Sequence, residues 1–438
     1  MIARAIVSEL RGLDARRLPE DVREVARQSL LDGFGVAVTG AREPLVATLL
    51  AEARRHGGNP LCTVIGHGER TSPALAALIN GAAADAADFS DALLAIHGHP
   101  TAAVMAAALA VTEERDGSGA DLLAAFVAGV EAECRVGLLV NPELYTETGF
   151  HPTGTLVHFG AAAAAAHAMR LDEAQWGYTL GIAATQAAGL KASAGTMAKP
   201  THCGFAAMHG VMGAGLAKAG FVSNPDAIDG FAATHSPARH EDAVRAAQGR
   251  FMILETRVKK HATCALTHST LENMLKLRPA DAAAIESVRL EVPAGHLQVV
   301  GKRHPRTELE AKFSLWNTAA MVLLGDDTSD LHAFGAGRFD RPAVTALMDR
   351  IEVRERADLD FSVAHATLQM KDGRRVEAVS DTSQPERNLP LRRRQVQAKF
   401  RALAEPVLGA SKARALEEAI LGVEKLPSIR KLLALVAP

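Results

Sequence analysis

The sequence has few aromatic residues, few cysteines and no excess of charge of either sign. Aromatic residues make up 4 % of the 438 residues, and the four cysteines stand singly along the chain. Scattered cysteines give no disulfide framework, so we expect a reducing, cytoplasmic compartment. The formal net charge of −2 provides no bulk attraction to nucleic acid or to a membrane surface, and neither is expected as a partner.

Long apolar runs are also missing. No window offers about 18 uncharged apolar residues, the length that a membrane-spanning helix needs. The first residues, MIARAIVSELRGLDARRLPEDV, form a charged amphipathic pattern and not the apolar stretch of a secretory signal. No G-x-G-x-x-G or Walker A sequence follows a predicted strand, and no H-E-x-x-H occurs. We therefore expect no nucleotide, metal or other cofactor.

Alanine and glycine are abundant, and apolar residues recur at helical spacing over most of the chain. Such small residues allow helices to pack closely. The segments predicted as helices before residue 256 are 22–38, 44–56, 72–84, 101–112, 119–138, 159–169, 173–190 and 200–219.

The pattern changes after about residue 256. Alternating residues predict strands over 287–292, 350–354, 361–370 and 375–379, with a hairpin turn at Lys371-Asp372-Gly373. Helices are predicted over 310–324 and 342–348, and again from about 393 to 435.

The predicted fold is therefore mainly α with an α+β insertion. Residues 1–256 and 391–438 would form a large all-helical domain, and residues 257–390 a smaller α+β lid domain. Three consecutive domains are the alternative.

The run GTMAKPTHCG contains Lys199 and His202, three residues apart. Pro200 fits the first position of a helix, where a missing N–H costs no hydrogen bond. A lysine at a helix N-terminus is disfavoured by the helix dipole, so an anion such as a substrate carboxylate is expected beside it. The alternative is an exposed lysine next to a helix start.

The segment DFSDALLAIHGHP, residues 88–100, places two carboxylates and two imidazoles in thirteen residues. Histidine exchanges protons near neutral pH, and a neighbouring carboxylate can orient it, so Asp88 and His99 are a candidate acid/base unit. Alternatively, Asp85, Asp88 and Asp91 form a polar stripe on a solvated helix. A metal held by His97 and His99 would need further ligands from distant segments.

Two further segments carry candidates. His151 precedes a Pro-Thr helix start, while Lys259 lies in the basic run RVKKHATC at the predicted domain boundary. His202 and His209 are seven residues apart and so share one helix face. A capped helix start and a solvated basic run are the plainer interpretations of these segments.

Taken together, FHPTGT, GTMAKPTHCG, DFSD…HP and EAKFS resemble the MmgE/PrpD family over about residues 5–435. The family includes 2-methylcitrate dehydratase, cis-aconitate decarboxylase and iminodisuccinate epimerase. The resemblance implies a homodimer whose pocket lies between a helical domain and an α+β lid, and which acts on small di- or tricarboxylates without cofactor. By position it implies pocket roles for Asp88, His99, His151, Lys199 and Lys259, with His202 one turn from Lys199.

One position departs from the family pattern. Where the decarboxylase has a pocket tyrosine after EA[KR], this sequence has Asn317, and neither Tyr145 nor Tyr178 lies in the predicted lid. This disfavours decarboxylation. The resemblance therefore predicts a lyase of the dehydratase type or an isomerase of the epimerase type. The alternatives are a cis-aconitate-type decarboxylase and a non-catalytic carboxylate-binding dimer.

Controlled proton transfer beside a carboxylate needs a positioned base and cations that stabilise developing charge. We expect His99 and His151 to be the acid/base pair and Asp88 to orient His99. Lys199 and Lys259 would clamp carboxylates, and His202 and Asn317 would contact the substrate.

Overall fold

The computed structural model describes residues 2–437, which divide into two compact units. The first comprises Met1–Leu190, Pro200–Val258 and Glu386–Pro438, and the second comprises Lys191–Lys199 and Lys259–Pro385. The chain is mainly helical with small sheets, as the sequence predicts.

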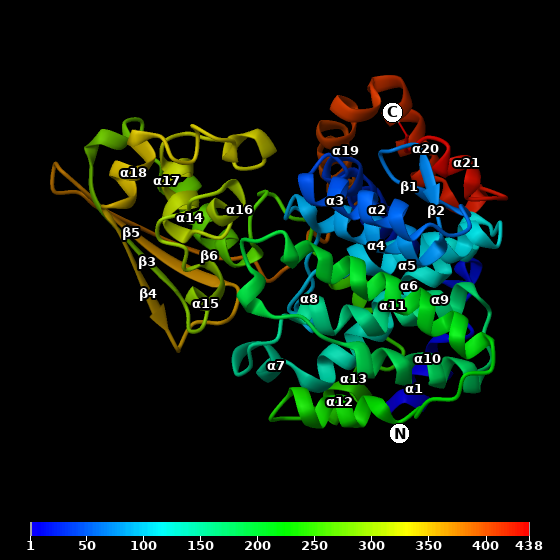
Figure 1. Ribbon diagram of the computed structural model, residues 1–438. Coiled ribbons are helices and arrows are strands. Elements are labelled where there is room, and N and C mark those ends of the chain that lie inside the picture. Colours follow the sequence, from blue (N-terminus) through cyan, green and yellow to red (C-terminus); the bar gives the residue numbers. More distant parts are fainter. Residues whose placement is uncertain (1, 438) are drawn as a thin grey trace. The chain divides into compact units, whose positions relative to one another are not determined.

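The first unit is built almost wholly of helices (Figure 1). They are α1 (Ile2–Leu10), α2 (Glu20–Gly40), α3 (Pro44–His56), α4 (Pro73–Ala86), α5 (Thr101–Glu114), α6 (Gly119–Val140), α7 (Glu143–Thr146), α8 (Pro152–Thr155), α9 (Val157–Ala168), α10 (Glu173–Gln186), α11 (Ala198–Lys218), α12 (Ala227–His235), α13 (Glu241–Ala246), α19 (Leu389–Leu408), α20 (Ala410–Leu421) and α21 (Arg430–Leu433).

Small side chains let the central helices of this unit approach one another closely. The alanine run of α9 is fully buried and packs against α5 and α6. A Cβ on Gly129 of α6 would lie 2.7 Å from the backbone oxygen of Gly160 in α9, so a larger residue would force these helices apart. The low aromatic content thus reflects a core filled by close backbone contact rather than by large rings.

A short hairpin interrupts the helices of the first unit. Strands β1 (Cys62–Val64) and β2 (Glu69–Thr71) pair antiparallel after α3. The expectation that this part of the chain is all-helical is therefore wrong in this detail. Each of these strands has three residues, which is too few to show the alternating apolar pattern by which longer strands are predicted.

The C-terminal segment returns to the first unit, where α19 packs along α2 (Figure 1). The ammonium group of Lys399 in α19 lies 2.7 Å from a carboxylate oxygen of Asp32 in α2 and donates to the backbone oxygen of Phe89. It also lies over the Phe89 ring. A residue from the C-terminal segment therefore fixes the loop that carries Asp88.

The second unit holds a four-stranded sheet in the order β4-β3-β5-β6. Strand β3 pairs parallel with β4 and antiparallel with β5, and β5 pairs antiparallel with β6. Helix α14 packs on β5 and β6, and α17 packs on β4. The elements are α14 (His268–Leu277), β3 (Ile285–Pro293), α15 (Leu297–Val300), α16 (Glu308–Ala311), α17 (Leu315–Leu323), α18 (Pro342–Met348), β4 (Ile351–Arg356), β5 (Val363–Met370) and β6 (Arg375–Asp381).

Several predicted elements differ in extent. The helix expected over 310–324 is two helices, α16 and α17, because the Ser314 side chain accepts from the Asn317 N–H and starts a new helix. Helix α11 begins at Ala198, so Pro200 is its third residue and not its first. Proline is tolerated there because the first four N–H groups of a helix have no intrahelical partner. Helices α12, α13 and α14 were not predicted.

In residues 2–437 no single helix has the length and apolar composition to cross a membrane. Only α2 and α3 taken together have that length and composition, and the two helices are bent by 82° where they join. The four cysteines are all buried, and none forms a disulfide.

Candidate functional site

The Asp88–Pro100 segment is a tight loop and not the continuation of a helix. Helix α4 ends at Ala86, and Asp88 has a positive φ of 53°. Leu93 and Gly98 then exchange backbone hydrogen bonds of 2.9 and 3.3 Å, which closes a small loop around the turn Leu94–Ile96. This closure returns the chain to Asp91 and brings His99 beside it.

The His99 ring is buried and held in one orientation. Its Nδ1 lies 2.6 Å from the backbone oxygen of Asp91, which can only accept a hydrogen bond. Nδ1 therefore carries a proton, and Nε2 is the nitrogen that can take one up. The His99 backbone N–H donates to Thr153 Oγ1 over 3.2 Å, and this joins the loop to the segment that follows His151.

Two buried carboxylates accompany His99. One oxygen of Asp85, one of Asp88 and one ring nitrogen of His99 lie within 4.8 Å of one another. Asp85, Asp88 and Asp91 are each 2 % exposed or less, so the alternative of a solvated acidic stripe is wrong. The three aspartates do not form an exposed helix face, because α4 ends before Asp88 and the following loop folds into the interior.

This cluster is the one group in residues 2–437 with the spacing of metal ligands. Two carboxylates and one imidazole would suit a divalent cation. The same three groups also suit proton exchange, since the carboxylates can stabilise an imidazolium. That the protein needs no metal stays a prediction.

His97 serves a different purpose from His99. Its backbone is left-handed, with φ 46°, and its ring stacks on Tyr145 at 5.8 Å between centroids. Burial, together with the charge of Arg257, lowers the pKa of His97 to about 4. His97 is therefore neutral at pH 7, and its stacking assigns it to packing.

His151 and His202 form a direct pair. Their Nδ1 atoms lie 2.9 Å apart, and the ring centroids 5.2 Å. His151 is the residue before α8, and its backbone N–H donates to the Gly189 carbonyl over 2.9 Å. The Thr153 contact to the His99 loop means that the first unit brings the segments of Asp88, His99, His151 and His202 together.

The two predicted lysines belong to the second unit and are both buried. Lys199 is 4 % exposed, and its ammonium group lies 5.9 Å from the centroid of the Phe313 ring. Lys259 is 3 % exposed and donates to the backbone oxygen of Thr263 over 2.9 Å. The alternative interpretations, an exposed lysine at a helix start and a solvated basic run, are therefore wrong for both residues.

Asn317 lies in the interior of the second unit. Its amide nitrogen donates to the Phe339 backbone oxygen over 2.8 Å and approaches Met348 Sδ at 3.5 Å. These contacts hold α17 against the segment that leads to α18. Substrate contact by Asn317 stays a prediction.

A further buried lysine and a second histidine pair were not predicted from the sequence. Lys191 is 6 % exposed, donates to the Gln298 side chain, and has its pKa lowered by burial. The sequence around Lys191 is rich in glycine and alanine, as it is around Lys199, and this pattern could have indicated a buried lysine. His158 pairs with His209, with Nε2 and Nδ1 3.1 Å apart. The separation of seven residues from His151 and His202 could have revealed this second pair.

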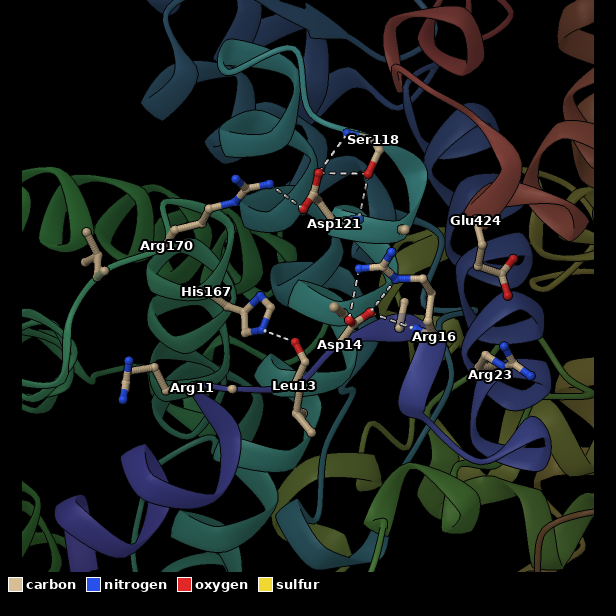
Figure 2. Close-up of a pocket in the computed structure, with 15 residues that line it drawn as sticks. Arg11, Leu13, Asp14, Arg16, Arg23, Ser118, Asp121, His167, Arg170 and Glu424 are labelled. Carbon is tan, nitrogen blue, oxygen red and sulfur yellow. Dashed lines mark hydrogen bonds and ion pairs between the residues drawn. The ribbon is translucent and has the colours of Figure 1, made fainter.

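A hollow of about 670 Å³ lies elsewhere in the first unit and is shown in Figure 2. Its lining includes four arginines. Two of them are neutralised by carboxylates, Arg16 by Asp14 and Arg170 by Asp121, each at 3.1 Å. None of the predicted site residues lines it, and we assign it no role.

Fold and site define a mainly helical protein with buried histidine–carboxylate groups, joined to an α+β unit with buried lysines. Residues 4–243 match the MmgE/PrpD N-terminal domain, and residues 261–425 match the MmgE/PrpD C-terminal domain. The chain belongs to the MmgE/PrpD family, as the sequence motifs predict.

Curated relatives span nearly the whole chain. A cis-aconitate decarboxylase of Mus musculus is 27 % identical over 432 residues, which cover 93 % of this chain and 87 % of the relative. The cis-aconitate decarboxylase of Homo sapiens is 27 % identical, with 93 % and 88 % covered. That of Aspergillus terreus (strain NIH 2624 / FGSC A1156) is 26 % identical, with 96 % and 92 % covered.

Proposed function

We propose that this protein is a cofactor-independent enzyme that moves a proton at a carbon next to a carboxylate of a small di- or tricarboxylate. The observation that carries the proposal is the state of His99. Its Nδ1–H is fixed on the Asp91 carbonyl, and the Asp85 and Asp88 carboxylates lie beside the ring. This arrangement leaves Nε2 as a base of defined direction, with anions that stabilise the imidazolium it becomes.

In this proposal His99 and His151 transfer protons and Asp88 orients His99. Lys199 and Lys259 bind carboxylates of the substrate. Both lysines are buried, and a contact between an ammonium group and a carboxylate is stronger away from bulk water, which supports this assignment. His151→Ala and Lys199→Ala are expected to abolish turnover while thermal unfolding stays cooperative. Near-normal activity of either variant would contradict the assignment.

Two reaction classes compete. The names of the relatives favour decarboxylation of cis-aconitate. The amide of Asn317 cannot act as the acid that a tyrosine hydroxyl supplies in the decarboxylase, which favours dehydration or epimerisation.

Incubation with cis-aconitate, 2-methylcitrate and iminodisuccinate in D₂O distinguishes these classes. Release of CO₂ identifies a decarboxylase, loss of water a dehydratase, and deuterium in an otherwise unchanged substrate an epimerase. Binding of all three without conversion would contradict the enzyme assignment and support a carboxylate-binding protein.

We further propose that the partner is a second copy of this chain, which docks on α11. Phe205, Met212 and Leu216 lie seven and four residues apart on this helix and are 42 %, 49 % and 43 % exposed. Their spacing places them on one helical face. An apolar stripe of this length favours burial against another protein surface.

A further inference from the structure

Histidines from two segments of the first unit meet in two pairs. His151 faces His202, with the Nδ1 atoms 2.9 Å apart, and His158 faces His209, with Nε2 and Nδ1 3.1 Å apart. His158 follows His151 by seven residues, and His209 follows His202 by seven residues, which is about two helical turns. The pairs therefore repeat along the contact of α8 and α9 with α11.

In the second pair the proton positions are fixed. His158 Nδ1 lies 2.7 Å from the Gly154 carbonyl and must donate to it. In the neutral ring Nε2 then has only a lone pair and accepts the N–H of His209 Nδ1. Burial, with the charge of His209, lowers the pKa of His158 to about 3, so this ring stays neutral.

In the first pair, His151 and His202, the proton positions are not fixed in this way, because two equivalent Nδ1 atoms face each other. One of them must carry a proton and the other must accept it. When both rings are neutral, the ring that donates has a lone pair on Nε2, and the ring that accepts has a proton on Nε2. Exchanging the two roles takes one proton across the 2.9 Å contact, one proton gained at Nε2 of the ring that donated, and one lost from Nε2 of the ring that accepted.

Glycine backbone allows the two rings to approach. A Cβ on Gly154 would lie 2.8 Å from the Ala188 carbonyl oxygen and 3.2 Å from Cγ of His202. A Cβ on Gly189 would lie 2.9 Å from the Gly154 Cα and 3.3 Å from Nδ1 of His202. Any larger residue at either position would displace backbone or the His202 ring, so the contact is built into the packing.

We propose that His202 is a positioning residue that exchanges a proton with His151 during turnover, an inference that rests on the proposed function of His151. His151 Nε2 takes the proton from the substrate carbon, and the C–H electron pair stays on the substrate as an enolate. The Nδ1 proton of His151 passes to Nδ1 of His202, which becomes the imidazolium. Reversal of this transfer, or release of the His202 Nε2 proton to water, restores the neutral pair.

The test compares His202→Asn with His209→Asn. Asparagine keeps a hydrogen-bonding group near the position of Nδ1 but cannot relay a proton. With cis-aconitate or 2-methylcitrate as the probe, kcat of His202→Asn is expected to fall about 100-fold while KM stays within about threefold. The proton taken from the substrate carbon does not come from solvent, so the His151 Nδ1 proton is the one exchangeable proton that moves in this step. kcat of the wild type is therefore expected to fall linearly with the D₂O fraction, and kcat of His202→Asn to be nearly independent of it. His209→Asn is expected to keep wild-type kcat.

Unchanged kcat with the wild-type D₂O dependence in His202→Asn would overturn the relay, as would an equal loss in His209→Asn. His151→Ala distinguishes failure of the proposed function from failure of the proton relay. If it remains active, the proposed function fails, whereas an inactive His151→Ala beside a fully active His202→Asn removes the relay alone.

Imidazole ¹⁵N spectra of the resting protein test the pair without turnover. His202→Asn is expected to shift both ring nitrogens of His151. Unchanged His151 resonances would overturn the proposal.

Discussion

The backbone carbonyl of Asp91 accepts the Nδ1–H of His99 over 2.6 Å. The same aspartate binds Thr101 with its side chain, accepting the backbone N–H over 3.2 Å and the hydroxyl over 2.5 Å. Asp91 therefore holds both ends of the turn that carries His99. Its carboxyl group is fully buried near Asp32, and these two facts raise the pKa of Asp91 to about 7.

The raised pKa of Asp91 predicts how stability depends on pH. Between pH 4 and 7 this carboxyl ionises in the unfolded chain but keeps its proton in the folded protein, so rising pH favours unfolding. Asp91→Asn keeps an acceptor for the Thr101 N–H, lets the amide donate to the Thr101 hydroxyl, and removes this ionisation. The difference in unfolding free energy, variant minus wild type, is expected to grow by a few kcal/mol, on the order of 1.4 kcal/mol for each pH unit.

Urea unfolding of both proteins at pH 4.5, 5.5 and 6.5 measures this difference. A difference that stays constant with pH would show that Asp91 is ionised in the folded protein. Asp372→Asn, in the exposed hairpin turn, serves as the control and is expected to show no such trend.

The cluster of Asp85, Asp88 and His99 makes a second prediction. If it exchanges protons and holds no cation, dialysis against EDTA leaves kcat and the melting temperature unchanged. Asp88→Asn is expected to lower kcat about 100-fold, because the imidazolium of His99 loses a stabilising charge. Loss of activity after EDTA with recovery on adding Mn²⁺ would instead identify a metal centre.

The buried lysines make a third prediction, for which the chain supplies a neighbouring control. Lys259→Met keeps the apolar stem and removes the charge, and kcat/KM is expected to fall about 10- to 100-fold, as for loss of one charged hydrogen bond. Lys260 is 69 % exposed at its side chain and lies 3.4 Å from Glu272, so Lys260→Met is expected to be near wild type. Steady-state kinetics that give equal effects would contradict the assignment of Lys259.

The exposed face of α11 makes a fourth prediction. Met212→Glu places a charge in the proposed contact between copies and is expected to shift the protein from dimer to monomer. Light scattering coupled to gel filtration measures the mass directly. Val379→Glu, at a 53 % exposed position on β6, is the matched control and is expected to leave the mass unchanged. A wild-type monomer would contradict the dimer itself.

Elements with strong local signals were predicted well from the sequence. The helices Pro44–His56 and Pro342–Met348 have the predicted bounds, and each begins at the expected residue because a proline starts it. The hairpin at Lys371-Asp372-Gly373 joins β5 and β6 as expected. The break between α16 and α17 was missed, because it depends on one serine hydroxyl and not on any change in apolar spacing.

For the candidate site, the sequence by itself determined which chemistry is present. It supplied carboxylate, imidazole and ammonium groups in short motifs, and these motifs identified the family. Only the tertiary structure decided which groups meet. The Leu93–Gly98 closure turns His99 back to Asp91, Lys399 from the far end of the chain fixes the loop of Asp88, and glycines bring His202 to His151. The last two contacts join residues 310 and 51 positions apart, and no local pattern encodes them, because they arise from packing between distant segments.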